Sequence, residues 1–314
     1  MTAKGQERSL VLGLAANFIL IGAKLAAGIL GASQAMLADA LNSVLDVVAG
    51  AVAWVGWRIS KRPPDANHHY GHQNAETVAA LFVGLAIFAT GGLIVRDVLS
   101  GISSGERAAP AAWTIIIAAA VIVTKTVLYI YTRSVARRTP SLVVSATATD
   151  HLMDVAATSG ALFGLIGAQF GFPILDPIAA IWVALLILIH GVMILRKNTF
   201  VLLGGAPSDR TIAEICRTLS GVPGVMGLHR TKVRTVGSQL LVDTEILVDG
   251  ALTVDEAHTI SNRAGDAVLA AHRDVTDVVV HIEPHSARRA AEGANPLTPR
   301  QHDLWRRREE NPTV

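Results

Sequence analysis

Six long apolar stretches limit what this chain can fold into. Each reaches about 20 residues, the length at which an α-helix crosses the hydrocarbon core of a bilayer. With 51% hydrophobic residues, 17% charged residues and a mean hydropathy of +0.44, the chain is too apolar for an ordinary soluble protein. We therefore predict a membrane protein of the all-α class, with six spanning helices at roughly 9–30, 35–59, 75–100, 111–134, 143–170 and 174–196.

The basic residues around these stretches indicate an orientation. If six helices alternate across the membrane, ten Lys and Arg residues fall on one side and only Arg96 and Arg107 fall on the other. Because cytoplasmic loops carry the excess of positive charge, we expect both termini in the cytoplasm and the protein in the plasma (inner) membrane. The residues on the cytoplasmic side are Lys4, Arg8, Arg58, Lys61, Arg62, Arg133, Arg137, Arg138, Arg196 and Lys197.

After residue 205 the composition becomes that of a soluble domain. Two Ser/Thr-x-x-Glu capping boxes, which begin at Thr211 and Thr253, predict helices near 208–220 and 253–271. β-branched residues and partial alternation predict three strands, at 226–235, 239–248 and 276–284. Two helices packed on one face of a three-stranded sheet would bury this α/β pattern economically.

Composition sets the remaining limits. The formal net charge of +2 does not favour a nucleic-acid partner, and a lone cysteine, Cys216, cannot form an intrachain disulfide. The last segment lacks apolar periodicity, which is typical of a flexible tail. The expected parts are a cytoplasmic N-terminus at 1–8, a transmembrane domain at 9–205, a cytoplasmic α/β domain at 206–285 and a flexible tail at 286–314.

Two polar pairs interrupt the apolar stretches, Asn42 with Asp46 and Asp150 with Asp154. Their i, i+4 spacing places both members on one helix face. A charged residue at this depth costs roughly 2.5 to 3.5 kcal/mol on insertion scales and normally faces a bundle interior, a water path or an ion. Four oxygen-bearing side chains suit a hard ion such as Mn²⁺, but the neighbouring His151 could offer nitrogen instead of the Asp150 oxygen, which would favour Zn²⁺. Polar bridges between helices, without metal, are the alternative.

Other polar residues in the stretches favour simpler interpretations. Lys24 and Lys125 fit snorkelling or pairing groups. Asp39 continues the helix face of Asp46 near its outer end, where solvation and a role at the pathway exit are equally open. His190, alone on the last stretch, fits a hydrogen-bonded histidine better than a ligand.

The loop PPDANHHYGHQNAE holds a compact group of possible metal ligands, Asp65, His68, His69 and His72. Histidine nitrogen and aspartate oxygen both suit Zn²⁺ and its neighbours. Because the loop is too short for all four residues to bind equally, we expect Asp65 with two or three histidines, or else a polar turn without metal.

Further possible ligands are dispersed over the soluble domain. On a strand, His281 and Glu283 point to the same face, as do Asp243 and Glu245. Each residue alone fits an exposed position, but together they permit a metal site at a subunit or sheet edge. The set is His229, Asp243, Glu245, His258, His281 and Glu283.

These features together resemble the cation diffusion facilitators, which are divalent-metal/proton antiporters. The likeness covers residues from about 9 to 285 and rests on six spans with both ends inside, polar pairs on spans two and five, a D-x-x-H-x-x-x-H loop and the helix-strand-strand-helix-strand domain. It implies a homodimer whose cytoplasmic domain has a ferredoxin-like, metallochaperone-like fold and binds metal. The residues it implicates are Asn42, Asp46, Asp150 and Asp154 as the transport site; Asp65, His68 and His72 in the loop; and His229, Glu245, His258, His281 and Glu283 in the cytoplasmic domain.

The chain departs from this family's pattern at three positions. Zinc-transporting relatives usually carry histidine where this chain has Asp150, so the set resembles the manganese-type branch. Asn74 stands where some relatives carry a lysine of an intersubunit charge interlock, and Gly204 stands near its acidic partner. The dimer contacts are therefore expected to differ.

The combined expectation is export of a divalent cation, most simply Mn²⁺, from the cytoplasm in exchange for protons. A Zn²⁺ or Fe²⁺ exporter of the same family is the alternative. A non-transporting metal sensor or partner subunit is an alternative of another class. A metallo-hydrolase built on the loop residues is disfavoured, because the sequence has no H-E-x-x-H helix and no nucleophile motif, and we do not expect an enzyme.

Overall fold

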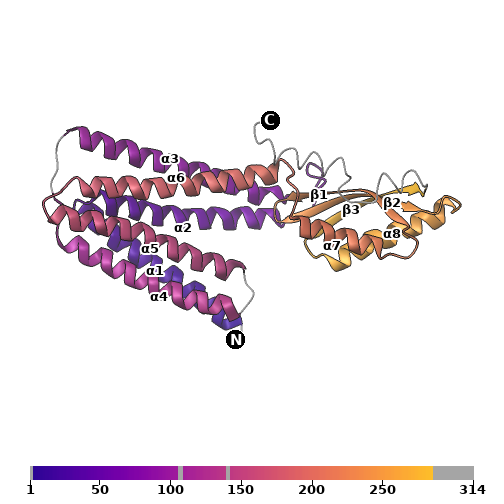
Figure 1. The fold of residues 1–314 in the computed structure, drawn as a ribbon, viewed down its shortest axis with the longest axis horizontal. Helices are drawn as coiled ribbons and strands as arrows, with labels where there is room; N and C mark the ends of the chain where they lie inside the picture. The colour runs from indigo at the N-terminus through magenta and orange to yellow at the C-terminus, as the bar shows by residue number, and fades with distance from the viewer. Residues whose placement is uncertain (1–2, 105–108, 139–141, 286–314) are drawn as a thin grey trace. The chain divides into compact units, whose positions relative to one another are not determined.

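The computed structural model describes residues 3–104, 109–138 and 142–285 of the 314-residue chain. The expected flexible tail at 286–314 lies outside the described residues. Within them, six long helices occupy the predicted stretches and confirm the helical membrane region (Figure 1). They are α1 (Ala3–Ile29), α2 (Gln34–Ser60), α3 (Asn74–Ser104), α4 (Trp113–Arg138), α5 (Leu142–Gln169) and α6 (Leu175–Leu202).

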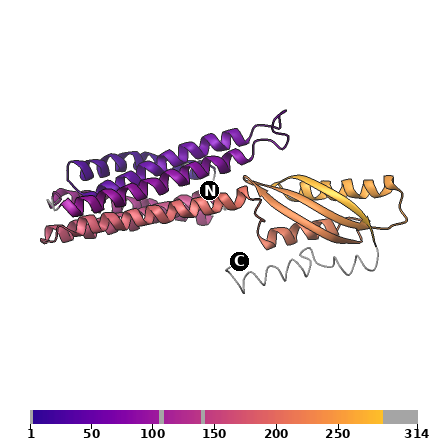
Figure 2. The ribbon, with the colours of Figure 1, turned by 90° about the horizontal axis from the view of Figure 1, so that it is seen from above.

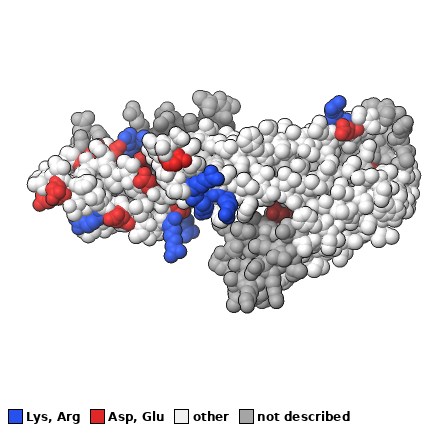
Figure 3. Space-filling model, turned by 180° about the vertical axis from the view of Figure 1, so that it is seen from behind, with Lys and Arg blue, Asp and Glu red and all other residues white. Residues whose placement is uncertain are grey.

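Length and apolar composition identify the helices that can span a membrane. In the described part of the chain, five helices, α2 to α6, meet both requirements, and α1 contributes a shorter apolar stretch at Ala15–Ile29. Large apolar side chains such as Phe82 and Phe163 are exposed on these helices, as expected where a helix faces lipid. Figure 3 shows the contrast: little charge is visible on the helical unit, whereas Lys, Arg, Asp and Glu gather on the α/β unit.

Small residues allow the membrane helices to approach closely. A Cβ atom added at Gly191 of α6 would lie only 2.9 Å from the backbone nitrogen of Phe88 on α3. Ala35 and Ala38 of α2 are also fully buried in the core that these helices share. Such close packing between membrane helices depends on residues without bulky side chains.

A carboxylate on α6 fixes the start of α2. Asp176 accepts hydrogen bonds from the Ser33 hydroxyl at 2.6 Å and from the backbone N–H of Gln34 at 2.7 Å. The Ser33 hydroxyl in turn accepts from the N–H of Met36 at 3.1 Å, as an N-cap serine does. This arrangement satisfies exposed N–H groups of the first turn and holds α2, with its polar pair, against α6.

The C-terminal part forms a three-stranded sheet in the order β1-β2-β3, with α7 and α8 packed on it (Figure 1 and Figure 2). Strands β1 and β2 pair antiparallel, whereas β2 and β3 pair parallel across the α8 connection. The predicted order and the α/β class are confirmed. The elements are α7 (Asp209–Ser220), β1 (Gly227–Val236), β2 (Gln239–Val248), α8 (Val254–Ala271) and β3 (Val275–Pro284).

The two predicted capping boxes have different outcomes. The box at Thr253 is confirmed: Glu256 N–H donates to the Thr253 hydroxyl at 3.3 Å, and the Glu256 carboxylate accepts from the Thr253 N–H at 2.8 Å. The box at Thr211 is wrong, because Ser208 is the N-cap of α7. Glu214 instead pairs with Arg210 at 2.9 Å, one helical turn away.

Contacts divide the chain into two compact units that do not follow the chain order. One unit runs to Val55 and from Ala79 to Arg196, and the other combines Gly56–Val78 with the chain from Lys197 onward. Within the second unit, the Gly237 N–H donates to the Asn74 side-chain oxygen at 3.2 Å. The loop after α2 therefore packs with the α/β domain.

Candidate metal sites

The α2 pair lies half-buried on one face of its helix. Asn42 Nδ2 donates to Asp46 Oδ2 at 3.4 Å, as the i, i+4 spacing predicts. Asp46 also interacts electrostatically with Asp154 and Asp150 on α5. The two predicted pairs therefore face a common region of the membrane unit.

The two α5 carboxylates have different surroundings. Asp154 is 6% exposed and forms an ion pair with Lys125 of α4, whereas Asp150 is exposed. The Lys125 ammonium also donates to Asn17 Oδ1 of α1 at 2.6 Å. The expected pairing of Lys125 is confirmed, but its partner, a candidate transport ligand, was not anticipated from the sequence.

His151 is the competing ligand on α5. Its side chain is 2% exposed, and neither ring nitrogen has a hydrogen-bond partner among the residues that the structure describes. It lies within electrostatic range of Lys125 and Asp154. A buried imidazole with both nitrogens available keeps the nitrogen alternative open.

A second buried lysine–aspartate pair lies beside the four-residue set of Asn42, Asp46, Asp150 and Asp154. Lys24 of α1 binds Asp39 of α2 at 2.9 Å and Ser43 at 3.0 Å, and both charged side chains are fully buried. Thr158 of α5 donates to the other Asp39 oxygen at 2.7 Å. The solvated position considered for Asp39 is therefore wrong, because α1 and α5 pack around its side chain.

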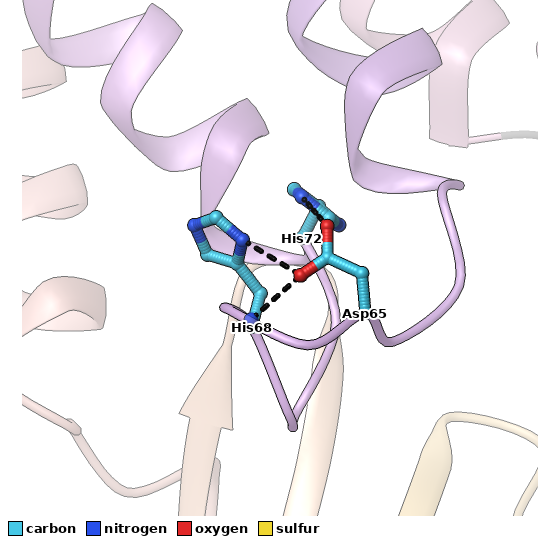
Figure 4. Close-up of side chains that lie close together, drawn as sticks. All are labelled: Asp65, His68 and His72. Atoms are coloured by element: carbon cyan, nitrogen blue, oxygen red, sulfur yellow. Dashed lines mark hydrogen bonds and ion pairs between the residues drawn. The ribbon is translucent and has the colours of Figure 1, made fainter.

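The loop after α2 brings three predicted ligands together (Figure 4). Asp65 Oδ1 lies 3.1 Å from His68 Nδ1, and Asp65 Oδ2 lies 3.4 Å from His72 Nε2. The three donor atoms lie within 4.8 Å of one another, while His69 is exposed and is not part of the group. One carboxylate and two imidazoles form a donor set that fits a divalent transition metal.

Backbone geometry holds the loop carboxylate in place. Asp65 Oδ1 accepts from the backbone N–H groups of Asn67 at 2.9 Å and His68 at 2.7 Å. These hydrogen bonds keep the pKa of Asp65 below its ordinary value, because they stabilise the charged form. Nδ1 of His72 has no hydrogen-bond partner within the described ranges, so this ring has a nitrogen to spare.

A β-bulge builds the third group, on the sheet. Arg230 and Leu228 have pairing partners on β2, but His229 between them is the extra residue. A bulge redirects a side chain, and here His229 Nδ1 lies 3.1 Å from both Glu245 Oε2 and Glu283 Oε2. These three donor groups also lie within 4.8 Å of one another.

Two other predicted cytoplasmic ligands, His281 and His258, are not members of this trio. His281 is 67% exposed, with Nε2 at 3.8 Å from Glu283 Oε1. His258, on α8, lines an open hollow together with His281. Arg230 donates through Nε to Glu245 Oε1 at 2.9 Å, a cation next to the trio that sequence reasoning did not include. Its position opposite Glu245 depends on the register of β1 against β2, so no local sequence signal reveals it.

The membrane set differs from the loop and sheet groups. Among the described residues, two groups bring three or more His, Cys, Asp or Glu donor atoms within 4.8 Å of one another. They are the loop group and the sheet group. The carboxylates of Asp46, Asp150 and Asp154 do not form such a set. They face one region without being gathered around one point.

The apolar helices carry facing carboxylates and are joined to an α/β domain with its own groups of possible metal ligands. These features are typical of a membrane protein that transports cations. Comparison with known proteins makes this specific: residues 10–203 match the cation efflux transmembrane domain, and residues 207–285 match the cytoplasmic domain of cation efflux proteins. The chain belongs to the cation efflux, or cation diffusion facilitator, family. It is a divalent metal cation efflux transporter.

Individual relatives extend over most of the chain. The manganese efflux system protein MneS of Bacillus subtilis is 31% identical over 284 residues, which cover 90% of this chain and 96% of that protein. The magnetosome protein MamM of Paramagnetospirillum magneticum is 31% identical over 88% of this chain and 87% of its own length. A solved MamM CTD variant is 31% identical and covers 24% of this chain and 96% of its own, with a TM-score of 0.24.

Proposed function

We propose that this protein exports Mn²⁺ from the cytoplasm in exchange for protons. The observation that carries the proposal is the oxygen-only set Asn42, Asp46, Asp150 and Asp154, in which Asp46 interacts electrostatically with both α5 carboxylates. Hard oxygen ligands without sulfur suit Mn²⁺. The name of the relative MneS, a manganese efflux system protein, agrees with this choice.

The exchange uses side chains that can hold either the metal or a proton. Mn²⁺ binds the set while it is open to the cytoplasm, and rearrangement of the helices then opens the set to the outside. There, protons compete for Asp46, Asp150 and Asp154, because metal binding requires the deprotonated carboxylates. Asn42 cannot titrate, so it adds a ligand without adding a proton to the exchange.

Both domains of the chain take part in the proposed transport. The transmembrane domain at 9–205 and the cytoplasmic domain at 206–285 act together, with both termini in the cytoplasm and the protein in the plasma (inner) membrane. Two copies associate as a homodimer. The loop group of Asp65, His68 and His72 and the sheet group of His229, Glu245 and Glu283 hold metal that biases the cycle.

A Zn²⁺ or Fe²⁺ exporter is the second candidate. The observation that favours it is the buried imidazole of His151, whose two nitrogens are both available next to Asp154. A rotation of α5 that replaced Asp150 by His151 at the site would add a nitrogen ligand. Imidazole suits Zn²⁺ and Fe²⁺ better than Mn²⁺.

A competition assay separates the candidates. The purified protein is placed in vesicles that contain a pH-sensitive dye, and uptake of Mn²⁺, Zn²⁺, Fe²⁺ and Co²⁺ is measured at several pH values. We expect the wild type to take up Mn²⁺ in preference to the other ions and to release protons in exchange. Asp150→His should shift the preference towards Zn²⁺, and His151→Ala should leave the preference for Mn²⁺ unchanged. Zn²⁺ preference that disappears in His151→Ala would establish the second candidate, and no uptake by the protein alone would favour a sensor or partner subunit.

A further inference from the structure

The Lys125 ammonium is paired with a carboxylate of the proposed transport set. Its side chain is 2% exposed in the middle of α4, and its ammonium pairs with Asp154. We infer that Lys125 is a built-in competing cation, which neutralises Asp154 when no metal is bound and must leave Asp154 before a divalent ion can use that carboxylate. This inference rests on the proposed function, because it assigns Asp154 to the transport set.

The low dielectric of the membrane interior makes this exchange necessary. An ionised, unpaired carboxylate is costly there, so Asp154 needs the ammonium, a metal ion or a proton in every state of the transporter. A metal ion on the same carboxylate would lie beside the ammonium, and two cations so close repel each other strongly where water does not screen them. Lys125 and the metal therefore exclude each other at Asp154.

Asn17 gives the displaced ammonium a second partner. Its Oδ1 already accepts from Lys125 Nζ at 2.6 Å, and it belongs to α1, which packs against α4. Lys125 can therefore withdraw from Asp154 by a movement of its flexible stem and keep one hydrogen bond. Lysine suits this role because its charge is a compact point, whereas arginine would hold the carboxylate through a rigid fork.

The single charge of the Lys125 ammonium also favours divalent over monovalent ions. A monovalent ion that replaced the ammonium at Asp154 would gain no charge over the group it displaced. A divalent ion brings twice the charge to the facing carboxylates of Asp46 and Asp150, so only it has a large electrostatic advantage. The return of Lys125 to Asp154 then helps to expel the metal after the set has opened outwards.

Lys24 provides a matched control. It is also fully buried and paired with an aspartate, but its partners Asp39 and Ser43 lie outside the four-residue set. Removal of either lysine charge leaves one buried aspartate without its cation. Only removal of the Lys125 charge frees a proposed metal ligand.

Mn²⁺ binding to the purified full chain tests the inference, with free Mn²⁺ measured by its electron paramagnetic resonance signal. We expect Lys125→Met to lower the dissociation constant of the Asp46-dependent site at least about tenfold, as the removal of a close charge in a buried pair can do. Lys24→Met should stay within about twofold of the wild type, which is the size of ordinary indirect effects. Lys125→Arg keeps the charge and holds Asp154 through a fork, so it should bind Mn²⁺ no more tightly than the wild type. In vesicles, Lys125→Met should lower the KM for Mn²⁺ and also lower the maximal rate, because release becomes slower.

We expect a variant of Asn17 to change Mn²⁺ binding in the opposite direction to Lys125→Met. Asn17→Leu leaves Lys125 with Asp154 as its main partner, so Mn²⁺ binding should become weaker while Lys125→Met makes it tighter. A purely structural role for these residues would move both variants in the same direction. If Lys125→Met does not fold, the Asn17→Leu result still decides, since unchanged or tighter binding would overturn the inference.

The outcome separates the inference from the proposed function. Asp46→Ala should remove one bound Mn²⁺ per chain, and if it removes none, the proposed transport set is wrong and the role of Lys125 falls with it. If Asp46→Ala removes one Mn²⁺ but folded Lys125→Met binds it no more tightly than the wild type, only the inference about Lys125 is overturned.

Discussion

The loop after α2 and the membrane helices α2 and α5 hold similar donor atoms in different ways. In the loop, Asp65, His68 and His72 already have their donor atoms within 4.8 Å of one another, and backbone N–H groups fix the carboxylate. In the membrane, Asp46 and Asp154 face one region, but Asp154 is held by Lys125.

This difference matches two tasks. Ligands that are gathered in advance pay little ordering cost, so they bind tightly and retain an ion. A set whose members are separate, and partly occupied by a protein cation, binds only after a rearrangement and gives the ion up when that rearrangement reverses. The first arrangement suits a resident metal, and the second suits a transported one.

The largest expected effect comes from Asp46→Ala. Loss of this carboxylate removes the α2 charge of the set and the acceptor of Asn42, so Mn²⁺ uptake into vesicles should fall to the level of protein-free vesicles. Asp97→Ala, at an exposed carboxylate of α3, should keep wild-type uptake. Wild-type uptake by folded Asp46→Ala would show that the set of Asn42, Asp46, Asp150 and Asp154 does not bind the transported ion.

The loop group predicts a smaller effect on binding. His72→Ala removes one of its three donors, so the affinity of the loop for a divalent metal should fall at least about tenfold, the lower range seen when metal-site residues are changed. His69→Ala, in the same loop but outside the group, should bind as the wild type does. Equal losses in both variants would show that the loop offers a histidine-rich surface and no defined site.

The sheet group of His229, Glu245 and Glu283 tests whether ligands brought together by a β-bulge bind metal as ligands brought together by a loop do. Glu283→Gln keeps the shape of the side chain but removes one charge beside His229, so metal affinity of the cytoplasmic domain should fall severalfold. His258→Ala should leave that affinity unchanged, because His258 lies outside the trio. Calorimetric titration of the full chain in an Asp46→Ala, His72→Ala background removes the transport set and the loop group and isolates this site. A loss confined to His258→Ala would place the site in the α8 hollow instead.

The sequence predicted what depends on local pattern. Apolar length located the membrane helices, and β-branched alternation located the strands to within about two residues, because both signals are periodic. The loop trio was also predictable, since Asp65, His68 and His72 are close in the chain. Contacts within one short loop need no knowledge of the fold.

Long-range pairing was not predictable in the same way. Lys125 and Asp154 are 29 residues apart and meet only because α4 and α5 pack side by side. The bulge that directs His229 towards Glu283 has no clear sequence signal, because it depends on the register of β1 against β2. His258 was grouped with the sheet ligands as a possible donor in the same domain, and its place outside the trio depends on how α8 packs on the sheet.

The smallest expected effect concerns the helix that supports the sheet group. Thr253→Ala removes the N-cap of α8, which typically costs about 1 kcal/mol. Amides of the first turn, measured by hydrogen exchange of the full chain, should then open about fivefold more often. Thr259→Ala, whose hydroxyl only bonds back to the Asp255 carbonyl, serves as the control and should show no such loss.

The pH dependence of this cap sharpens the same test. Hydrogen bonds from Thr253 hold the pKa of Glu256 below its ordinary value of 4.5. A depressed pKa in the folded state means that the carboxylate stabilises the cap above pH 4.5 and loses this contribution as the pH falls through the lowered value. The difference between wild type and Thr253→Ala should therefore shrink on acidification. If it did not, the cap would not depend on the Glu256 charge and would act through the hydrogen bond from the Glu256 N–H to the Thr253 hydroxyl.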